Sequence, residues 1–487
     1  MMRQPVPYSF ARTHGVLVAR LEEDSAHVLL RSGASLNALS ELRRVLGVPL
    51  RIEEIPADAF DRRVDAAYSE GSQAAAELAE GIEQDLDLAS LLQDAPRELD
   101  LLESQDGAPV IRMINALLTQ ALRDGASDIH IEPYADRSVV RYRIDGTMRN
   151  IVEPPRAVHA ALVSRIKVMA SLDIAEKRLP QDGRITLRLA GRTVDVRVST
   201  LPATQGERAV LRLLDKDSAH LDLSRLGMSA GTLASVDRLI RQPHGILLVT
   251  GPTGSGKTTT LYAAMSRLDS VRLNIMTVED PVEYELPGIG QTQVNMRIDL
   301  SFARALRAIL RQDPDIIMIG EIRDFETAQI AIQASLTGHL VLATLHTNDA
   351  ASAITRLVDM GVEPFLLSSS MLGVLAQRLV RKLCPSCRRP DPRGAEALQR
   401  HGIPPGDSFD ADGCPQCAHT GHKGRTGIYE LLPIDAALRS LIHDRAPEEA
   451  LRAHALANGM TGLREDGLRW IATGEVSVSE LLQATRD

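Results

Sequence analysis

The sequence predicts an α/β protein whose largest domain, residues 225–378, is built on a parallel β-sheet. Short apolar runs alternate with helical stretches there, as expected for parallel strands covered by helices on both faces. A glycine-rich turn follows the first run directly. Polar residues follow the later runs, at the strand ends where parallel sheets place their functional loops. The four runs read GILLVTG, NIMTVE, IIMIGE and LVLATLH.

The first strand and its turn, residues 246–258 (ILLVTGPTGSGKT), match the phosphate-binding pattern G-x-x-x-x-G-K-[ST]. Glycines let the backbone approach a phosphate closely, and the amides of the turn and the following helix point at the anion. Lys257 supplies a positive charge for the β and γ phosphates, and Thr258 a hydroxyl for Mg²⁺. A chance glycine-rich turn is the alternative, but the flanking strand and helix favour a nucleoside triphosphate site. Its predicted residues are Gly251, Pro252, Thr253, Gly254, Ser255, Gly256, Lys257 and Thr258.

Acidic residues follow the second and third strands, and a histidine follows the fourth. Carboxylates in these positions hold Mg²⁺ through water and orient or deprotonate an attacking water. Glu321 directly follows an apolar strand and is the first candidate for this role, with Glu283 and Glu279 next. Each carboxylate has the alternative role of capping a helix. His346 is a candidate for sensing the γ phosphate or bridging to the acids, although a single histidine is more often structural.

A chain of 487 residues is too long for one hydrophobic core, so we expect several domains. The predicted divisions are an N-terminal α/β domain (1–80), an acidic linker (81–107), an arginine-bearing domain (108–224), the parallel-sheet domain (225–378), a tetracysteine subdomain (379–424) and a helical domain (425–487). The linker segment is also compatible with a solvated helix face.

Composition limits the partners and the location. Aromatic residues make up 3% of the chain and the formal net charge is −9, which argues against base-stacking surfaces and a general basic field. We therefore expect no nucleic-acid partner. The first residues contain no signal sequence, and no apolar run approaches the 18 residues that span a bilayer. A cytoplasmic protein that reaches a membrane only through a partner is expected.

The strands predicted within residues 108–224 carry arginines at alternating positions. One interpretation is the charged, solvent-facing side of a sheet, which composition alone favours. The other is an arginine surface directed at a bound nucleotide. The arginines are Arg184, Arg188, Arg192, Arg197, Arg208 and Arg212.

All four cysteines fall in one segment, as Cys384-x-x-Cys387 and Cys414-x-x-Cys417. Two close pairs of thiolates match a closed, tetrahedral and therefore structural Zn²⁺ site. The segment between the pairs is rich in loops and buries few apolar side chains, so metal binding would supply the stability that apolar burial cannot. Redox chemistry is the alternative, but two such pairs in one insertion favour metal.

Several motifs, in order along the chain, resemble the secretion ATPase superfamily that drives type II secretion and type IV pili. They are GPTGSGKTTTLY, VEDPVEY, LRQDPDIIMIGEIRD, GHLVLATLHTNDA and the paired CxxC. The opening PYSFARTHGVLV resembles the type II secretion subgroup, general secretory pathway protein E. The resemblance implies a RecA-like ATPase domain preceded by a PAS-like α+β domain, a small N-terminal α/β domain and a tetracysteine zinc insertion. ATP, Mg²⁺ and Zn²⁺ are the implied ligands.

The resemblance also implies roles for particular residues and partners. VEDPVEY corresponds to the family's aspartate box, DPDIIMIGEIRD to its Walker B motif, and GHLVLATLHT to its histidine box, with His339 and His346. Arg197 and Arg212 match arginines that reach the nucleotide, and Arg425 matches a further basic position. Such proteins are hexamers on the cytoplasmic face of the inner membrane. Residues 1–80 are then expected to bind the cytoplasmic domain of a membrane-anchored secretion protein. ATP hydrolysis is expected to change the angle between the two larger domains, and this motion would act on an inner-membrane platform protein.

Three alternative functions remain at this stage. A type IV pilus assembly ATPase has the same chemistry and a different filament. A DNA translocase shares the phosphate loop, but the charge and the few aromatic residues oppose it. A nucleotide-gated scaffold would assemble on ATP and hardly turn it over.

Overall fold

The computed structural model describes residues 108–189, 192–215, 222–401, 403 and 406–486, and in the N-terminal region 14–21, 25–32, 34, 39, 42–43, 48–56, 60 and 63. The predicted linker, 81–107, lies outside the described residues. Contacts divide the chain into two units, residues 1–119 with 187–193 and residues 120–186 with 194–487. Among the described helices, none combines the length and the apolar character needed to cross a membrane.

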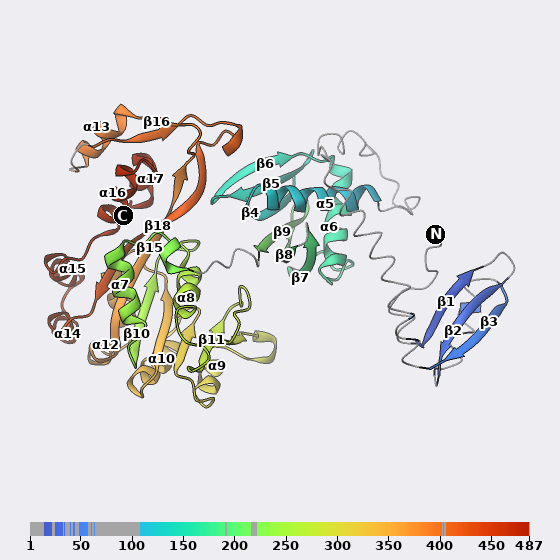
Figure 1. The fold of residues 1–487 in the computed structure, drawn as a ribbon, viewed down its shortest axis with the longest axis horizontal. Helices are drawn as coiled ribbons and strands as arrows, with labels where there is room; N and C mark the ends of the chain where they lie inside the picture. Colours follow the sequence, from blue (N-terminus) through green and yellow to red (C-terminus); the bar gives the residue numbers. More distant parts are fainter. Residues whose placement is uncertain are drawn as a thin grey trace. The chain divides into compact units, whose positions relative to one another are not determined.

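A three-stranded sheet forms the described part of the N-terminal region (Figure 1). Its strands are β1 (Val16–Leu21), β2 (Ala26–Arg31) and β3 (Leu50–Ile55). β1 pairs antiparallel with β2, and β2 pairs parallel with β3. Alternating Val and Leu side chains of β1 and β2 form one small core, as expected for strands of a small α/β domain.

Residues 126–215 form a six-stranded sheet in the order β6-β5-β4-β9-β8-β7. Its elements, with two helices, are α5 (Ala108–Arg123), β4 (Ala126–Pro133), β5 (Ser138–Ile144), β6 (Thr147–Val152), α6 (Arg156–Met169), β7 (Gln181–Leu189), β8 (Arg192–Ala203) and β9 (Gly206–Asp215). Asp145 and Gly146 form the turn between β5 and β6, with φ of 49° and 82°, as a two-residue hairpin requires. β6 was not predicted, because this edge strand lacks clear apolar alternation and only its last residue is buried.

The parallel sheet predicted for residues 225–378 is confirmed, with strand order β12-β11-β13-β14-β10-β15-β18. All neighbouring strands are parallel except β15 and β18. The strands are β10 (Gly245–Thr250), β11 (Ile275–Glu279), β12 (Gly290–Gln293), β13 (Ile316–Ile319), β14 (Leu340–Leu345), β15 (Met371–Leu383) and β18 (His422–Pro433). β10 lies between β14 and β15, so the turn that follows it emerges at the centre of the sheet.

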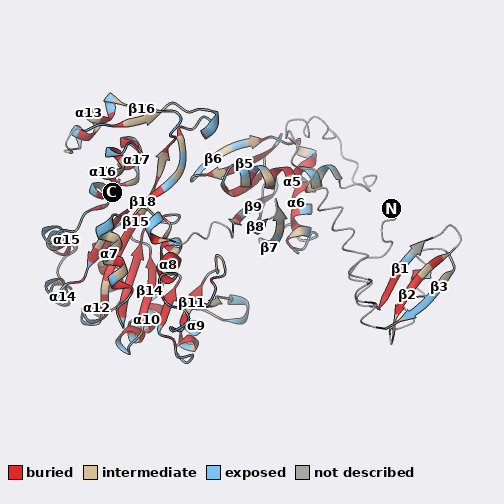
Figure 2. Ribbon diagram, viewed as in Figure 1, coloured by how far each residue is buried: buried red, intermediate tan, exposed pale blue. Residues whose placement is uncertain are grey.

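Both faces of this sheet are buried, and the central strands are red along most of their length in Figure 2. Alternate residues of β10 enter different cores: Leu247 and Val249 join the core of α7 and α8, whereas Ile246 and Leu248 join the core of α9 to α12. The helices are α7 (Ala230–Leu239), α8 (Lys257–Met265), α9 (Phe302–Ile309), α10 (Phe325–Leu336), α11 (Ala350–Asp359) and α12 (Pro364–Ser370). Burial on both faces explains why the strands read as continuous apolar runs.

The C-terminal part differs from the expected helical tail at its beginning. Residues His422–Pro433 form β18, an edge strand of the seven-stranded sheet, and helices follow only afterwards. This strand depends on pairing with β15, about fifty positions earlier, which local sequence pattern does not reveal. The remaining elements are β16 (Arg388–Pro390), α13 (Pro392–Arg400), β17 (Phe409–Ala411), α14 (Ala436–His443), α15 (Glu448–Ala457), α16 (Leu463–Ala472) and α17 (Val478–Ala484).

Candidate nucleotide site and tetracysteine cluster

The glycine-rich turn connects the buried strand β10 to α8. Its backbone conformation and its close packing require glycine at two positions. Gly256 precedes the helix with φ of 87°, in the left-handed region. Gly251 has φ of 147°, and a Cβ there would lie 2.4 Å from the Gln377 carbonyl oxygen. The turn therefore presses against β15 while the first amides of α8 point out of the helix end, which is the arrangement that binds phosphate.

A cleft of about 460 Å³ lies over this turn. Residues 253–259 line it from the loop and the start of α8, and Glu279, Glu283, Glu321 and His346 line it from the other strand ends. Ser127 and Arg212 contribute from the six-stranded sheet, and Arg425 from β18. The volume is within the usual range for a ligand pocket. Most of the predicted nucleotide-site residues thus converge on one cleft.

Lys257 is buried beneath this cleft. Its Nζ donates to the carbonyl oxygens of Gly251 (2.8 Å) and Pro252 (3.1 Å), and lies 3.4 Å from Nδ1 of His346. Burial lowers the pKa of Lys257 to about 8, although the Glu321 carboxylate acts in the opposite direction. The ammonium group is consequently held within the loop, close to where phosphate oxygens bind.

Nucleotide affinity is expected to fall as the pH rises above about 8. Phosphate binds the ammonium form of Lys257, whose pKa in the free protein is about 8. Below that pH the lysine is already protonated, whereas above it binding requires proton uptake and the Kd rises by up to about tenfold per pH unit. Fluorescent-nucleotide titrations from pH 6.5 to 9.5 measure this dependence. A Kd that stays constant up to pH 9.5 contradicts it.

Glu321 follows β13 and Gly320 and faces His346. Its Oε2 lies 3.4 Å from His346 Nε2, and its side chain is 14% exposed. Arg323 donates to the other carboxylate oxygen. His346 therefore lies between Lys257 and Glu321, which connects the phosphate loop to the predicted water-activating carboxylate.

Glu279 and Glu283 have different surroundings. Glu279 is 2% exposed and accepts hydrogen bonds from Thr277 (2.6 Å), Gln291 (3.1 Å) and Tyr262. This network ties the end of β11 to α8, so the carboxylate already has several donors. Glu283 is more exposed and is bonded by Arg197 (3.0 Å), which also donates to the Val282 carbonyl.

Three of the predicted arginines reach this region. Burial lowers the pKa of the Arg197 guanidinium despite the neighbouring Glu283 carboxylate. Arg212 is 58% exposed and donates from Nε to Asp128 Oδ1 at 2.9 Å, with its side chain along the cleft. Arg425 also lines the cleft, and its Nε lies 3.7 Å from Asp145 Oδ1.

Other predicted basic residues lie elsewhere. Arg208 contacts Glu132 at 2.7 Å and Arg184 contacts Asp195 at 2.6 Å, and neither lines the cleft. The side chains of Arg188 and Arg192 lie outside the described residues. His339 precedes β14 whereas His346 follows it, and at about 3.3 Å per residue the two are about 20 Å apart. His339 bonds to the Ala334 carbonyl (2.8 Å) and is not part of the cleft.

Sequence reasoning missed residues that hold the site from neighbouring elements. Tyr262 of α8 donates to Glu279, and Gln377 of β15 donates to the Ser255 carbonyl at 2.6 Å. Thr250 contacts Thr347 Oγ1 at 2.7 Å and thereby ties the end of β10 to the segment after His346. Thr250 and Tyr262 lie within the phosphate-loop motifs, but their partners, like that of Gln377, lie on other elements, and only the strand order reveals these contacts.

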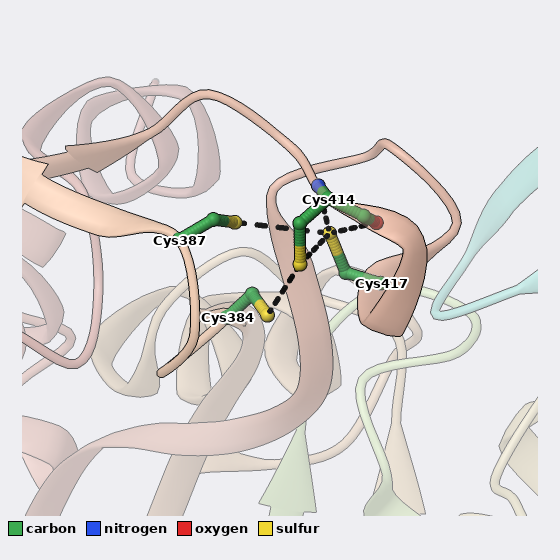
Figure 3. A group of neighbouring side chains, drawn as sticks. All are labelled: Cys384, Cys387, Cys414 and Cys417. Carbon is green, nitrogen blue, oxygen red and sulfur yellow. Dashed lines mark hydrogen bonds between the residues drawn. The ribbon is translucent and has the colours of Figure 1, made fainter.

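The four cysteines gather at the end of β15 and around residues 414–417 (Figure 3). The Sγ–Sγ distances are 3.9 Å for Cys384–Cys414, 3.8 Å for Cys387–Cys417 and 3.8 Å for Cys414–Cys417. Four thiolates at about 2.3 Å from one Zn²⁺ have sulfur atoms about 3.8 Å apart, whereas a disulfide needs about 2.05 Å. The cluster therefore fits a tetrahedral metal.

The backbone around Cys417 favours a thiolate. The amides of Cys414 and Gly421 each donate to its Sγ at 3.2 Å. Burial raises the pKa of this thiol, but the two amide donors, together with hydrogen bonds from the Cys387 and Cys414 side chains, outweigh that effect and lower the pKa to about 6. Thiolates are the form in which cysteines bind zinc.

Purified protein is expected to contain one zinc ion per chain. Cys414→Ser should lose the metal and lower the Tm by several degrees, since 1 kcal/mol shifts the Tm of a domain of 150–250 residues by about 2–4 °C. Ser386→Ala is the matched control, because Ser386 lies between two of the cysteines and contacts Gln416 at 2.5 Å without belonging to the sulfur cluster. Full metal content in Cys414→Ser would show that this cluster is not the zinc site.

Comparison with known proteins agrees with this architecture. The sequence profile of the family described as "Type II/IV secretion system protein" matches residues 103–483, and that of an N-terminal domain of "GSPII protein E" matches residues 5–68. The chain is 61% identical to "Type II secretion system protein HxcR" of Pseudomonas aeruginosa, over 99% of both chains. It is 52% identical to "Type II secretion system ATPase E" of Vibrio cholerae, over 99% of this chain and 97% of the relative.

Solved structures support the fold. The pilus retraction motor PilT with bound ADP is 26% identical, with a TM-score of 0.53 over 77% of this chain and 97% of PilT. The Legionella pneumophila ATPase DotB is 19% identical, with a TM-score of 0.57 over 80% of this chain and 97% of DotB, and indicates the fold alone. With the long family match and the near-complete relatives, these findings show that the chain belongs to the type II/IV secretion system protein family and is an ATPase.

Proposed function

We propose that the chain is a hexameric ATPase that powers pseudopilus assembly and protein export by the type II secretion system. The observation that carries this proposal is the single cleft in which the phosphate loop, Glu321, His346 and Arg212 meet. The names of relatives that match over the whole chain, "Type II secretion system protein E" among them, support the biological role.

In this proposal the chain's own residues divide the work of hydrolysis. Backbone amides of residues 253–258 and the Lys257 ammonium would hold the phosphates, and the Thr258 hydroxyl would be a ligand for Mg²⁺, which would neutralise phosphate charge. Glu321 orients and deprotonates the attacking water, and His346 keeps the Glu321 carboxylate in position beside Lys257. Glu283 assists, while Glu279 keeps the end of β11 fixed to α8 through its buried hydrogen bonds.

The arginines complete the site from outside the ATPase sheet. Arg212 lines the cleft from β9, and Arg197 of β8 bonds to Glu283 beside it. Guanidinium groups stabilise the charge that develops on the transferred phosphoryl group. When hydrolysis releases the transferred phosphoryl group, Arg197 and Arg212 lose the group that both stabilise. We propose that the angle between the two domains then changes and that the hexamer passes this motion to an inner-membrane platform protein.

We further propose that residues 1–80 bind the cytoplasmic domain of a membrane-anchored secretion protein and so place the ATPase on the inner face of the inner membrane. Support comes from the match of residues 5–68 to the N-terminal domain of GSPII protein E. The same match favours type II secretion over the alternative, a type IV pilus assembly ATPase. Zinc in the tetracysteine cluster would have a structural role only, because four protein ligands leave no open position.

ATP turnover by purified protein with and without the partner's cytoplasmic domain and anionic lipid tests this function. We expect stimulation by the partner that disappears when residues 1–80 are removed and when Lys257 is replaced by alanine. Low turnover under every condition would favour a nucleotide-gated scaffold. Stimulation by DNA that falls steeply with salt would favour a nucleic-acid translocase.

A further inference from the structure

β15 continues beyond the point where its neighbour β10 turns away into the phosphate loop. The two strands pair up to Thr250 and Ala376, and Gln377 is the next residue of β15. Leu375 faces the core of α7 and α8, so the alternation of the strand places Gln377 on the side from which α8 begins. On the edge of β15 that pairs with β10, Gln377 is therefore the first residue beside the loop instead of the strand, while its other edge still pairs with β18.

The side chain of Gln377 contacts the loop backbone directly. It is 1% exposed, and its Nε2 donates to the Ser255 carbonyl oxygen at 2.6 Å. The backbone carbonyl oxygen of Gln377 lies 2.4 Å from where a Cβ of Gly251 would be, and its side-chain Nε2 lies 3.2 Å from where a Cβ of Gly256 would be. Gln377 therefore contacts the turn near its beginning and near its end.

We propose that Gln377 is a positioning residue that sets the phosphate loop in its binding conformation. The Ser255–Gly256 peptide precedes a glycine, which permits either orientation of that peptide plane. A carbonyl turned into the cleft would repel phosphate oxygens, whereas an amide there attracts them. By holding the Ser255 carbonyl, the Gln377 amide keeps this peptide in one orientation before nucleotide arrives.

The inference rests on the proposed nucleotide site, and Gln377→Met tests it, because methionine has a similar length and no N–H donor. We expect the Kd for a fluorescent ADP analogue to rise about 5- to 30-fold, as expected for loss of one buried hydrogen bond at the loop. The kcat at saturating ATP should change less than threefold, because the bound phosphates then hold the loop themselves.

Gln377→Glu supplies a readout that a purely structural role would not give. At pH 8 a carboxylate cannot donate to the Ser255 carbonyl, so affinity should fall further than in Gln377→Met. At pH 6 the carboxyl group is more often protonated and can donate again, so the ratio of mutant to wild-type Kd should decrease. A ratio independent of pH would overturn the proposal.

Arg381→Met is the matched control on the same strand. Arg381 lies four residues further along β15 and bonds to Glu480 at 3.0 Å, away from the loop. Its loss should lower the Tm of nucleotide-free protein and leave the Kd within twofold. If Gln377→Met lowers the Tm equally and leaves the Kd unchanged, Gln377 is structural and the inference fails. If Lys257→Ala also binds ADP normally, the proposed nucleotide site itself fails.

Discussion

Glu321→Gln is expected to lower ATP turnover by about 100-fold or more while leaving the Kd for ATP within about twofold. Glutamine keeps the size of the side chain but cannot accept a proton from water, and general-base catalysis contributes about 10²- to 10⁴-fold. The position favours this outcome, because Glu321 lies on the cleft beside His346 and is only 14% exposed. Steady-state phosphate release and equilibrium nucleotide binding measure the two quantities separately.

Glu326→Gln is the matched control for this substitution. Glu326 is five residues further along the chain, is exposed, and pairs with Arg307 at 2.6 Å outside the cleft. Its replacement should leave turnover unchanged. Full turnover in Glu321→Gln would exclude Glu321 as the base and move the assignment to Glu283, another incompletely buried carboxylate on the cleft.

Arg212→Ala is expected to reduce kcat by about a thousandfold, with a smaller effect on ATP affinity. An arginine directed at the transferred phosphoryl group is worth about 10³- to 10⁵-fold in turnover. Arg212→Lys should recover only part of the loss, because an ammonium lacks the planar fork of the guanidinium. Single-turnover hydrolysis separates this chemical effect from product release.

Arg184→Ala controls for loss of an arginine from the same sheet. Arg184 is half exposed and pairs with Asp195, much as Arg212 pairs with Asp128, yet it does not line the cleft. It should retain near-normal turnover. Equal activity of the Arg212→Ala and Arg184→Ala proteins would show that the arginines of this sheet only cover its charged face.

The polar face of β4 shows what a sequence pattern does and does not determine about burial. Along β4, period-two alternation separates Ile129 and Ile131, which enter the core, from Asp128, His130 and Glu132 on the other face. It did not reveal that these polar residues are buried as well, because Arg141 and Arg208 both contact Glu132 at 2.7 Å. Pairing between distant strands turns a row that looks solvent-exposed into an ion-pair layer.

The nucleotide site shows the same limit. The phosphate loop and the strand-end acids were predictable, because short motifs fix their local conformation and parallel strands bring their carboxyl ends to one edge. The different surroundings of Glu279 and Glu321 were not predictable. Glu279 is surrounded by Tyr262, Thr277 and Gln291, whereas Glu321 faces the cleft. β18 and Gln377 were also missed, because both depend on which strands lie beside β15.

The proposed mechanism requires a site that is completed from outside the ATPase sheet within an assembled ring. Its most direct test is ATP turnover per chain, measured over a range of protein concentrations together with the oligomeric state in the same samples. Turnover should rise in parallel with the hexamer fraction and fall to background where the chain is monomeric. A monomer that hydrolyses ATP at the full rate would contradict the mechanism.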